Sequence, residues 1–295
     1  QKAICQGRVK KYQKKVQTLK KLKNKFSESQ YKAEAIYEIG RTYHSNIENN
    51  QKAINFYNKY VDDYPQGARV RSALSSLANL YYNQNNLDKS LNIYKTVIAK
   101  FPGSNEAVNA LEMIKNISVE MNNPDYYVNY VEEEGINTNL SDTEKDSLVY
   151  TSAEKLYRDN KIEQAVSAFK NYINDYPNGR HLLNAHYYSA RCKESLNKTE
   201  QALKNYEYII GQPNNQYTVE SLTKAASMSF DKEYYQKAFD YYYKLNQLAS
   251  KNEKVLIARL GMLRSAYLNN DYENVVKAAK LLLNSDKLSD VQKRE

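Results

Sequence analysis

The sequence predicts an all-α fold, an α-solenoid of about seven to eight helix–turn–helix repeats. Three observations predict it. Small residues recur at a nearly constant spacing, polar turns separate apolar helical faces, and glycine and proline are scarce, with 8 and 5 copies in 295 residues. Repeats in a solenoid bury their core against their neighbours only, so the length does not imply two ordinary domains. We therefore predict a single solenoid over residues 1–295.

The first observation is a small residue that is followed, on the same face of a helix, by large apolar residues. Ala165 is followed at spacings of four by Phe169 and Ile173, and Pro177 ends that helix because proline cannot continue its hydrogen bonds. The same order recurs, and successive small residues are separated by 37, 75, 37 and 36 positions. These anchors are Ala53, Ser90, Ala165, Ala202 and Ala238.

The interval of 75 residues spans two periods, so it predicts a hidden copy centred near Tyr127 and Val128. Extrapolation places further anchors near Val16 and Val276. Each copy also has an upstream helix whose small residue precedes the downstream anchor by twelve or thirteen positions. We call the upstream helix A and the downstream helix B. The A anchors are Gly40, Ala78, Ala153, Ala190 and Ala226.

One copy carries a recognisable motif in full: Leu74, Leu77, Ala78, Tyr81, Ser90, Tyr94 and Pro102. This pattern resembles the tetratricopeptide repeat, which implies a right-handed superhelix. The period here is longer than the usual ~34 residues, and the excess follows the proline. That longer link is similar to the repeats of the bacterial outer-membrane assembly lipoprotein and of the periplasmic coordinator of the Tol-Pal system.

Two parts of the chain depart from the pattern. The copy near residues 105–136 lacks small residues and a closing proline, so the chain is a candidate for division into sub-arrays 1–136 and 137–295. The sequence opens at a B-type helix and closes with Ser289 or Asp290 placed to cap another A helix. We therefore expect this chain to be a segment of a longer repeat array.

The formal net charge of +9 is concentrated at one end. Residues 1–25 hold ten Lys or Arg and no acid, whereas the remainder holds 33 basic and 34 acidic residues. Either a terminal helix solvates its outer face with lysine, or the helix meets an anionic partner, nucleic acid or membrane. We favour the first and expect no nucleic acid, because six apolar residues recur at helical spacing as a packed face. They are Val9, Tyr12, Val16, Leu19, Leu22 and Phe26.

No catalytic, cofactor or metal motif is present in the sequence. The three histidines have no ligand spacing, and phosphate-binding glycine loops are missing. Cys5 and Cys192 are isolated, and we expect an exposed thiol at Cys5 and a buried one at Cys192. No apolar run reaches membrane-spanning length. We predict that the protein is not an enzyme, and that any membrane association involves regions outside this chain.

The resemblance implies that A helices line a concave groove that binds protein or peptide. Tyrosines mixed with Arg, Asn and Glu suit an extended peptide, although each tyrosine could instead pack against the next repeat. Carried over copy by copy, the groove residues are Tyr37, Arg41, His44, Asn79, Tyr82, Tyr150, Glu154, Tyr157, Tyr187, Arg191 and Glu194.

The function implied by the resemblance is a non-enzymatic binding scaffold of the bacterial cell envelope, in the periplasm or at the outer membrane. The alternative is a cytoplasmic regulatory or sensor repeat domain of a larger protein. An enzyme is the third and least favoured hypothesis, because a repeat groove rarely forms a deep polar pocket.

Overall fold

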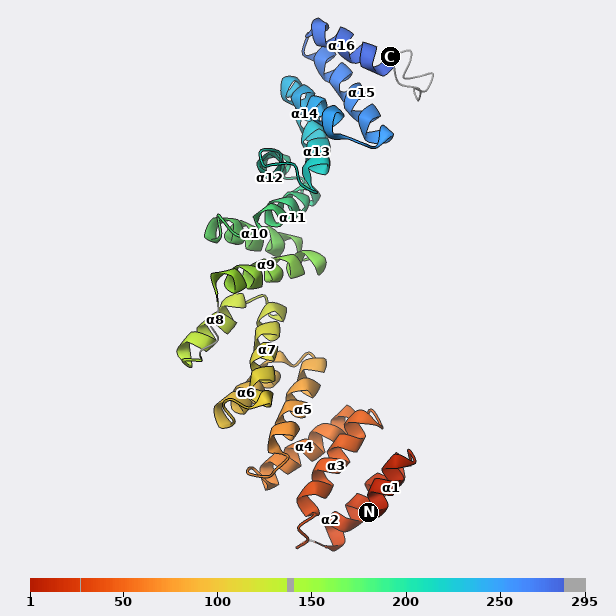
Figure 1. The fold of residues 1–295 in the computed structure, drawn as a ribbon, viewed down its shortest axis with the longest axis vertical. Helices are drawn as coiled ribbons and strands as arrows, with labels where there is room; N and C mark the ends of the chain where they lie inside the picture. Colours follow the sequence, from red (N-terminus) through yellow and green to blue (C-terminus); the bar gives the residue numbers. More distant parts are fainter. Residues whose placement is uncertain (27, 137–140, 284–295) are drawn as a thin grey trace. The chain divides into compact units, whose positions relative to one another are not determined.

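The computed structural model describes residues 1–26, 28–136 and 141–283, and all regular secondary structure in these ranges is helical (Figure 1). The described residues form sixteen helices. Contacts divide the chain into two compact units, Gln1–Glu133 and Glu134–Glu295. The predicted cap at Ser289 or Asp290 lies outside the described residues.

Unit 1 contains eight helices: α1 Lys2–Arg8, α2 Tyr12–Lys25, α3 Lys32–Ser45, α4 Asn50–Asp63, α5 Val70–Asn83, α6 Leu87–Lys100, α7 Asn105–Glu120 and α8 Pro124–Glu133. Unit 2 contains another eight: α9 Asp142–Arg158, α10 Ile162–Asp175, α11 Leu182–Ser195, α12 Thr199–Ile210, α13 Thr218–Asp231, α14 Tyr235–Leu248, α15 Asn252–Leu268 and α16 Tyr272–Leu283. Odd-numbered helices are A helices, and even-numbered helices are B helices. The sequence was expected to open at a B helix, but the short helix α1 precedes α2 as its A partner.

Within each unit, consecutive helices pack against one another along the chain. A helices of successive pairs also touch, α5 with α7 in unit 1, and α9 with α11 and α13 with α15 in unit 2. This is the contact pattern of a solenoid, in which each pair covers the apolar side of the next. The predicted fold class is confirmed for the described part of the chain.

The backbone itself repeats at the turn from each A helix to its B helix. One residue in each turn has a positive φ between 53° and 62°, the left-handed region. Successive turns are 36 to 38 residues apart, and they include the copy whose sequence had lost its motif. Eight helix pairs are therefore present among the described residues. The turn residues are Lys10, Glu48, Asn85, Asn122, Asn160, Asn197, Glu233 and Asn270.

The small anchors lie where an A helix and its B helix approach most closely. All five predicted B anchors are 0% exposed. At Gly40, an added Cβ would lie 3.0 Å from the ring of Tyr57, so the B-helix aromatic occupies the space that a side chain would need. Close approach of the helices at small residues, with large rings beside them, is the packing that the sequence predicted.

The last anchor is shifted from its predicted position. Val276 is 53% exposed, and Ala278 is the fully buried residue of α16. The turn before α16 keeps the usual spacing, because Asn270 follows Glu233 by 37 residues, so the shift arises within α16, which buries Ala278 and exposes Val276. The extrapolation near Val276 was therefore wrong by two residues. In the middle copy, Tyr127 of the short helix α8 is buried as expected for an anchor position.

The links between pairs explain the recurring Pro-x-Gly sequence. The hydroxyl of Tyr60 in α4 accepts a hydrogen bond from the backbone N–H of Arg69, which begins the next A helix, at 3.0 Å. A Cβ on Gly67 would lie 2.5 Å from that hydroxyl oxygen. The same arrangement recurs at Gly179 and Tyr172. Glycine is required in these links because the tyrosine hydroxyl bonds the backbone beside it.

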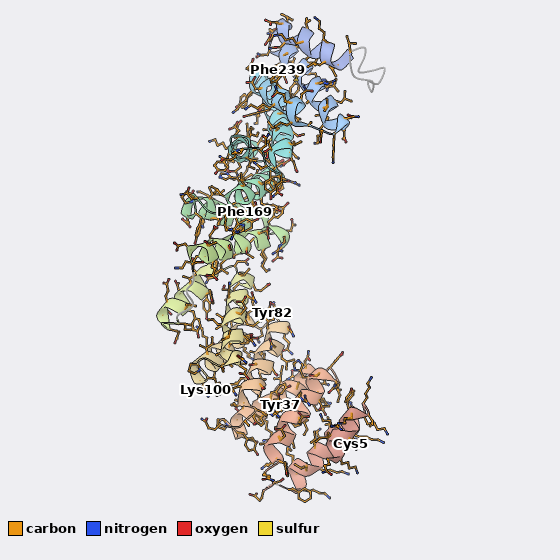
Figure 2. All side chains as sticks on the ribbon, in the orientation of Figure 1. Cys5, Tyr37, Tyr82, Lys100, Phe169 and Phe239 are labelled. Atoms are coloured by element: carbon orange, nitrogen blue, oxygen red, sulfur yellow. The ribbon has the colours of Figure 1, made fainter. Side chains whose placement is uncertain are left out.

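The expected apolar face of the basic N-terminal segment forms only in part. Val16 and Leu19 are buried, and Tyr12 and Leu22 are half-buried, but Val9 and Phe26 are 60% and 64% exposed. One helical period does not run through the segment, because a left-handed residue at position 10 separates α1 from α2. Cys5, on α1, is exposed and Cys192 is buried, as predicted (Figure 2). None of the described helices has the length and apolar character needed to span a bilayer.

Candidate functional site

The eleven predicted groove residues lie on four A helices, two in each unit. Each occupies a fixed position relative to the small anchor of its helix. The residues are Tyr37, Arg41 and His44 on α3, Asn79 and Tyr82 on α5, Tyr150, Glu154 and Tyr157 on α9, and Tyr187, Arg191 and Glu194 on α11. Both units are described separately below.

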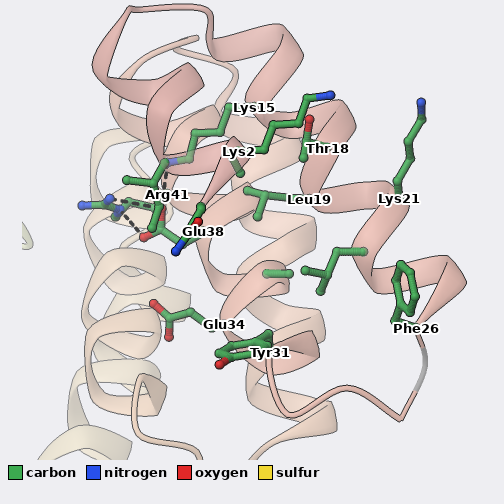
Figure 3. Close-up of a pocket in the computed structure, with 15 residues that line it drawn as sticks. Lys2, Lys15, Thr18, Leu19, Lys21, Phe26, Tyr31, Glu34, Glu38 and Arg41 are labelled. Carbon is green, nitrogen blue, oxygen red and sulfur yellow. Dashed lines mark hydrogen bonds and ion pairs between the residues drawn. The ribbon is translucent and has the colours of Figure 1, made fainter.

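In unit 1, Arg41 is held by an acid of its own helix. Its Nε lies 2.8 Å from Oε1 of Glu38, and Nζ of Lys15 in α2 lies 2.7 Å from the other carboxylate oxygen (Figure 3). Burial opposes ionisation of Glu38, but the hydrogen bonds from Lys15 and Arg41 outweigh it and hold its pKa below the usual value. The Arg41 side chain is still half exposed, so it can contact a ligand.

The other predicted residues of unit 1 make separate local contacts. His44 packs edge-on against the ring of Tyr57, and burial lowers its pKa. The side-chain oxygen of Asn79 accepts a hydrogen bond of 2.7 Å from the hydroxyl of Tyr94, while Tyr82 is half-buried. In the described part of unit 1, no hydrogen bond or ion pair joins two of the five predicted residues. Unit 1 therefore does not assemble them into one site.

In unit 2, two of the predicted tyrosines form joints between successive helix pairs. The ring of Tyr150 stacks on His181 with centroids 4.4 Å apart and planes 9° apart. The ring of Tyr187 stacks on Tyr217 at 4.2 Å and 18°. In both cases a residue three positions before an A anchor meets the N-cap residue of the next A helix. We call this contact the interpair joint.

Unit 1 has an equivalent interpair joint in which the second residue is a cation. The guanidinium of Arg69, the N-cap residue of α5, lies 5.6 Å from the ring centroid of Tyr37. The three joint tyrosines are buried, with exposures between 4% and 8%. They thus pack against the neighbouring repeat, the alternative that the sequence left open. Direct peptide contact by Tyr37, Tyr150 and Tyr187 stays a prediction.

The interpair joint on α11 is part of a longer row of aromatic rings. Tyr157 of α9 lies 5.0 Å from Tyr188 of α11, Tyr188 lies 5.4 Å from Tyr187, and Tyr187 stacks on Tyr217. We call these four residues the tyrosine run. Tyr157, Tyr188 and Tyr217 are only half-buried, so three of the four rings present a face or an edge to solvent. The run connects α9, α11 and the start of α13.

Arg191 lies beside the tyrosine run and bridges two A helices. Its Nη1 donates to the hydroxyl of Tyr187 at 3.1 Å and to Oε1 of Glu220 in α13 at 3.1 Å. Burial disfavours its charge, but the contacts with Tyr187 and Glu220 outweigh burial and raise its pKa. Burial and the nearby Glu220 raise the pKa of Tyr187 to about 12, so the phenol stays protonated and available as a donor.

A second ion pair links α11 and α13, and here α11 supplies the acid and α13 the base. Glu194 of α11 pairs with Lys224 of α13 and also accepts a hydrogen bond of 3.0 Å from the hydroxyl of Tyr206. Arg191 and Glu220 supply the first pair, so each helix contributes one acid and one base. These four side chains are 28% to 43% exposed, which leaves polar edges beside the tyrosine run.

Glu154 completes the predicted set on α9. It accepts a hydrogen bond of 2.9 Å from the hydroxyl of Tyr150, and it lies 3.9 Å from the guanidinium of Arg158. Burial is the main reason that the pKa of Tyr150 is raised, and the hydrogen bond to Glu154 adds to it. Tyr150 and Glu154 are thus joined within α9, and Tyr187 and Arg191 within α11, while Tyr188 connects the ring of Tyr157 to that of Tyr187.

Sequence reasoning missed four members of this surface: Tyr188, Tyr217, Glu220 and Lys224. Tyr188 and Lys224 lie two positions before their anchors, next to the motif position that was used. Glu220 lies four before Lys224, so both share one helical stripe. A search of every residue on the same face of each A helix, and not only of the motif positions, would have found Tyr188, Glu220 and Lys224. Tyr217 precedes its helix, and only the geometry of the interpair joint identifies it.

No group of three or more His, Cys, Asp or Glu side chains that could hold a metal ion occurs in the ranges that the structure describes. A cleft of about 750 Å³ lies between α1, α2 and α3 in unit 1; the predicted residue Arg41 lines it, and none of the predicted tyrosines does (Figure 3). The surface around the tyrosine run consists of half-buried aromatic rings and partly exposed ion pairs.

The sequence model of the tetratricopeptide repeat family matches three segments, residues 34–67, 72–104 and 150–179. These segments cover α3–α4, α5–α6 and the later part of α9 with α10, so the match is to three of the helix pairs and to about a third of the chain. No curated protein sequence matches the chain. The matched family is one of interaction modules, and it indicates no catalytic activity.

Several solved structures are similar to the chain at low identity. Pseudomonas aeruginosa pilF is 15% identical, with 76% of this chain and 97% of that chain covered and a TM-score of 0.37. A tetratricopeptide repeat protein from Parabacteroides merdae is 14% identical, with 88% and 96% covered and a TM-score of 0.40. PilW, a type IV pilus biogenesis factor, is 11% identical, with 90% and 98% covered and a TM-score of 0.34.

Proposed function

We propose that the protein is a non-enzymatic scaffold that binds an extended peptide segment of a partner protein along the A-helix surface of unit 2. The observation that carries the proposal is the tyrosine run, Tyr157, Tyr188, Tyr187 and Tyr217, with polar edges on α11 and α13 beside it. Tetratricopeptide repeats are generally scaffolds for protein contacts, and this surface has the chemistry that such a contact needs.

The chemistry of the surface favours a peptide. Half-buried tyrosine rings offer apolar area at a low entropic cost, since each has few rotatable bonds. Arg191 and Lys224 provide donors, and Glu194 and Glu220 provide acceptors, so a backbone in extended conformation can form hydrogen bonds along the row. Because donors and acceptors alternate, we propose a segment of mixed polarity and not a strongly charged tail.

The cellular setting is part of the proposal. The link after the proline resembles that of envelope repeat proteins, which supports a periplasmic or outer-membrane-associated scaffold. A cytoplasmic regulatory domain of a larger protein is the alternative. Fractionation of cells that produce the full-length protein distinguishes the two: recovery with the envelope supports the first, and recovery only in the cytosol replaces it with the second.

A site-specific photo-crosslinking experiment tests the binding surface. A benzophenone amino acid is placed at Tyr157 or at Tyr188, and the matched control carries it at Tyr243, which is 46% exposed on the B helix α14 of the same unit. We expect a defined partner adduct from the first two positions and none from Tyr243. Equal adducts at all three positions would contradict the proposal.

A binding measurement then follows with a synthetic peptide that corresponds to the crosslinked segment. The variant Tyr157→Ala/Tyr188→Ala should weaken binding by at least about tenfold, because aromatic contacts at interfaces often contribute more than 1 kcal/mol each. The control Tyr243→Ala should bind as the parent does. The predicted residues of unit 1 are tested in parallel by a probe at Tyr82, which remains a candidate contact.

A further inference from the structure

We propose that the N-terminal end of unit 1 is a binding surface for membranes rich in anionic lipid. The surface consists of apolar and basic side chains on α1 and on one stripe of α2, and we call it the N-terminal basic surface. Its members are Lys2, Ile4, Arg8, Val9, Lys14, Lys21, Lys25 and Phe26. The proposal is independent of the peptide-binding function of unit 2.

The orientation of α1 decides which residues it presents. One face of α1 packs on α2, because the side chain of Gln6 accepts a hydrogen bond of 2.8 Å from Thr18, and Gly7 lies against the stem of Lys15. The remaining side chains are Lys2, Ile4, Cys5, Arg8 and Val9, and all five are exposed. Lys2 and Ile4 line the cleft beside α2 and α3, so the exposed side of α1 includes the rim of that cleft.

The surface is more apolar than a solvated helix requires. Ile4 and Val9 are 60% exposed and Phe26 is 64% exposed. Ile4 and Phe26 line the 750 Å³ cleft together with the apolar side chains of Leu19 and Leu22 (Figure 3). Burial in a bilayer interface would remove this apolar area from water.

The charge around these apolar residues has one sign. Lys14, Lys21 and Lys25 lie seven and four positions apart, so they form one stripe along α2. With Lys2 and Arg8 they make five exposed cations, and none of the five has an ion-pair partner in the described part of the chain. Residues 1–25 contain no acid at all.

Glu28, two residues after Phe26, is exposed, whereas the two acids of α3 that lie next to the surface are already paired. Glu34 lines the cleft, but its carboxylate lies 3.2 Å from the guanidinium of Arg69. Glu38 is bonded to both Lys15 and Arg41. The five cations are therefore not neutralised by the next helix, and the surface is complementary to an anionic partner.

The mixture of aliphatic and basic side chains favours a membrane over a nucleic acid. Aliphatic side chains enter the boundary between headgroups and acyl chains, while Lys and Arg are attracted to the lipid phosphates of an anionic surface. Single-stranded nucleic acids instead require aromatic platforms between the cations. Contact with the phosphate backbone of a nucleic acid would not bury the apolar side chains of Ile4 and Val9 in an apolar environment.

A fluorescence experiment on the intact chain tests the proposal, and the protein supplies its own labelling site. Cys5 lies in the centre of the exposed face of α1, whereas Cys192 is buried and burial raises its pKa to about 11. A thiol-reactive, environment-sensitive dye should therefore label Cys5 selectively. Labelled protein is mixed with vesicles of phosphatidylcholine alone or with vesicles rich in phosphatidylglycerol.

We expect binding and a blue-shifted emission only with phosphatidylglycerol vesicles, and weaker binding at high salt. Lys14→Glu/Lys21→Glu/Lys25→Glu should lower the partition coefficient by at least about tenfold. The matched control, Lys170→Glu/Lys204→Glu/Lys244→Glu, makes the same change in net charge at exposed lysines of unit 2 and should bind as the parent does. Ile4→Ser/Val9→Ser should weaken binding without changing the salt dependence.

All substituted side chains are exposed, so circular dichroism and thermal melting should match the parent. The proposal is overturned if phosphatidylglycerol vesicles do not bind, if both triple variants bind alike, or if binding leaves the Cys5 dye unshifted. It is also overturned if a DNA duplex shifts the dye as strongly and Ile4→Ser/Val9→Ser has no effect on that shift. A dye shift that follows protein concentration without vesicles would assign the surface to self-association instead.

Discussion

The hydroxyl of Ser90 donates a hydrogen bond of 2.9 Å to the carbonyl oxygen of Ala78, and both residues are fully buried. These are the B and A anchors of one helix pair. A side chain of one helix thus touches the backbone of the other. The requirement for a small residue at an anchor is therefore a requirement for contact between helix backbones, and it can be tested directly.

Substitution at Ser90 should separate the two components of this contact. Ser90→Ala keeps the close approach and loses the hydrogen bond, so we expect a loss of about 0.5–1.5 kcal/mol in the free energy of unfolding. Ser90→Leu must push the helices apart and should cost about 3 kcal/mol or more. Urea denaturation measures both. Ser167→Ala, at an exposed serine, is the control and should change stability by less than about 0.5 kcal/mol. Equal effects of Ala and Leu at position 90 would contradict this account.

Gly179 should be intolerant of even one added carbon. A Cβ there would lie 2.5 Å from the hydroxyl oxygen of Tyr172, which bonds Asp146 and the N–H of His181. We expect Gly179→Ala to lower the melting temperature, at a cost of about 1–3 kcal/mol.

The matched test for Gly179 is a double-mutant cycle. In a Tyr172→Phe background the hydroxyl is gone, so Gly179→Ala should cost clearly less there. An identical cost in both backgrounds would show that the hydroxyl is not the cause.

Glu233 should be replaceable with a gain in stability. Its φ is +62°, which is strained for a residue with a Cβ but not for glycine. Five of the eight equivalent turn positions hold asparagine, which tolerates this conformation better. We expect Glu233→Gly to stabilise unit 2 by about 0.5–1 kcal/mol in urea denaturation. The reverse change, Asn197→Glu, should destabilise by a similar amount. A loss of stability on Glu233→Gly would disprove the strain argument.

His186 should make stability depend on pH. Its ring stacks on Tyr208 at 3.7 Å and bonds Asn205, and burial lowers its pKa to about 4 from 6.5. The unfolded chain takes up a proton below pH 6.5 while the folded chain does not, so stability is full above 6.5 and falls towards pH 4. The loss at pH 4 should be about 3 kcal/mol.

The comparison for His186 is the pH slope of a variant that keeps the stack. His186→Phe should flatten the fall in unfolding free energy between pH 6.5 and pH 4, while carboxylates contribute equally in both proteins. Unchanged slopes would show that His186 does not titrate as described.

Much of the fold could be predicted because the repeat imposes the same packing problem eight times. The anchors Ala53, Ala165 and Ala202 were found from spacing alone, since backbone contact admits few residue types there. Irregularities were less predictable. Helix α16 buries Ala278 and exposes Val276 although the turn before it keeps the usual spacing, and the break at Lys10 exposed Val9. A period measured elsewhere in the chain contains no information about which side chain a terminal helix buries or about a local turn.

The candidate site was predicted less completely than the fold. Motif positions located Tyr157, Arg191 and Glu194 on one surface, because each position has a fixed direction on an A helix. They did not show that Tyr150 would be buried in an interpair joint by His181. That contact depends on the conformation of the link between pairs, where helical periodicity does not apply.

The interpair joints also have a mechanical consequence. Between α3 and α5 the joint is formed by Tyr37 and Arg69, but the corresponding residue of α5 is Ser75, whose buried hydroxyl has no hydrogen-bond partner in the described structure. The link between α5 and α7 is instead an ion pair, with Arg71 and Glu106 3.6 Å apart. Because this pair is partly exposed, salt screens it, and the resistance of unit 1 to bending at this position should weaken at high ionic strength.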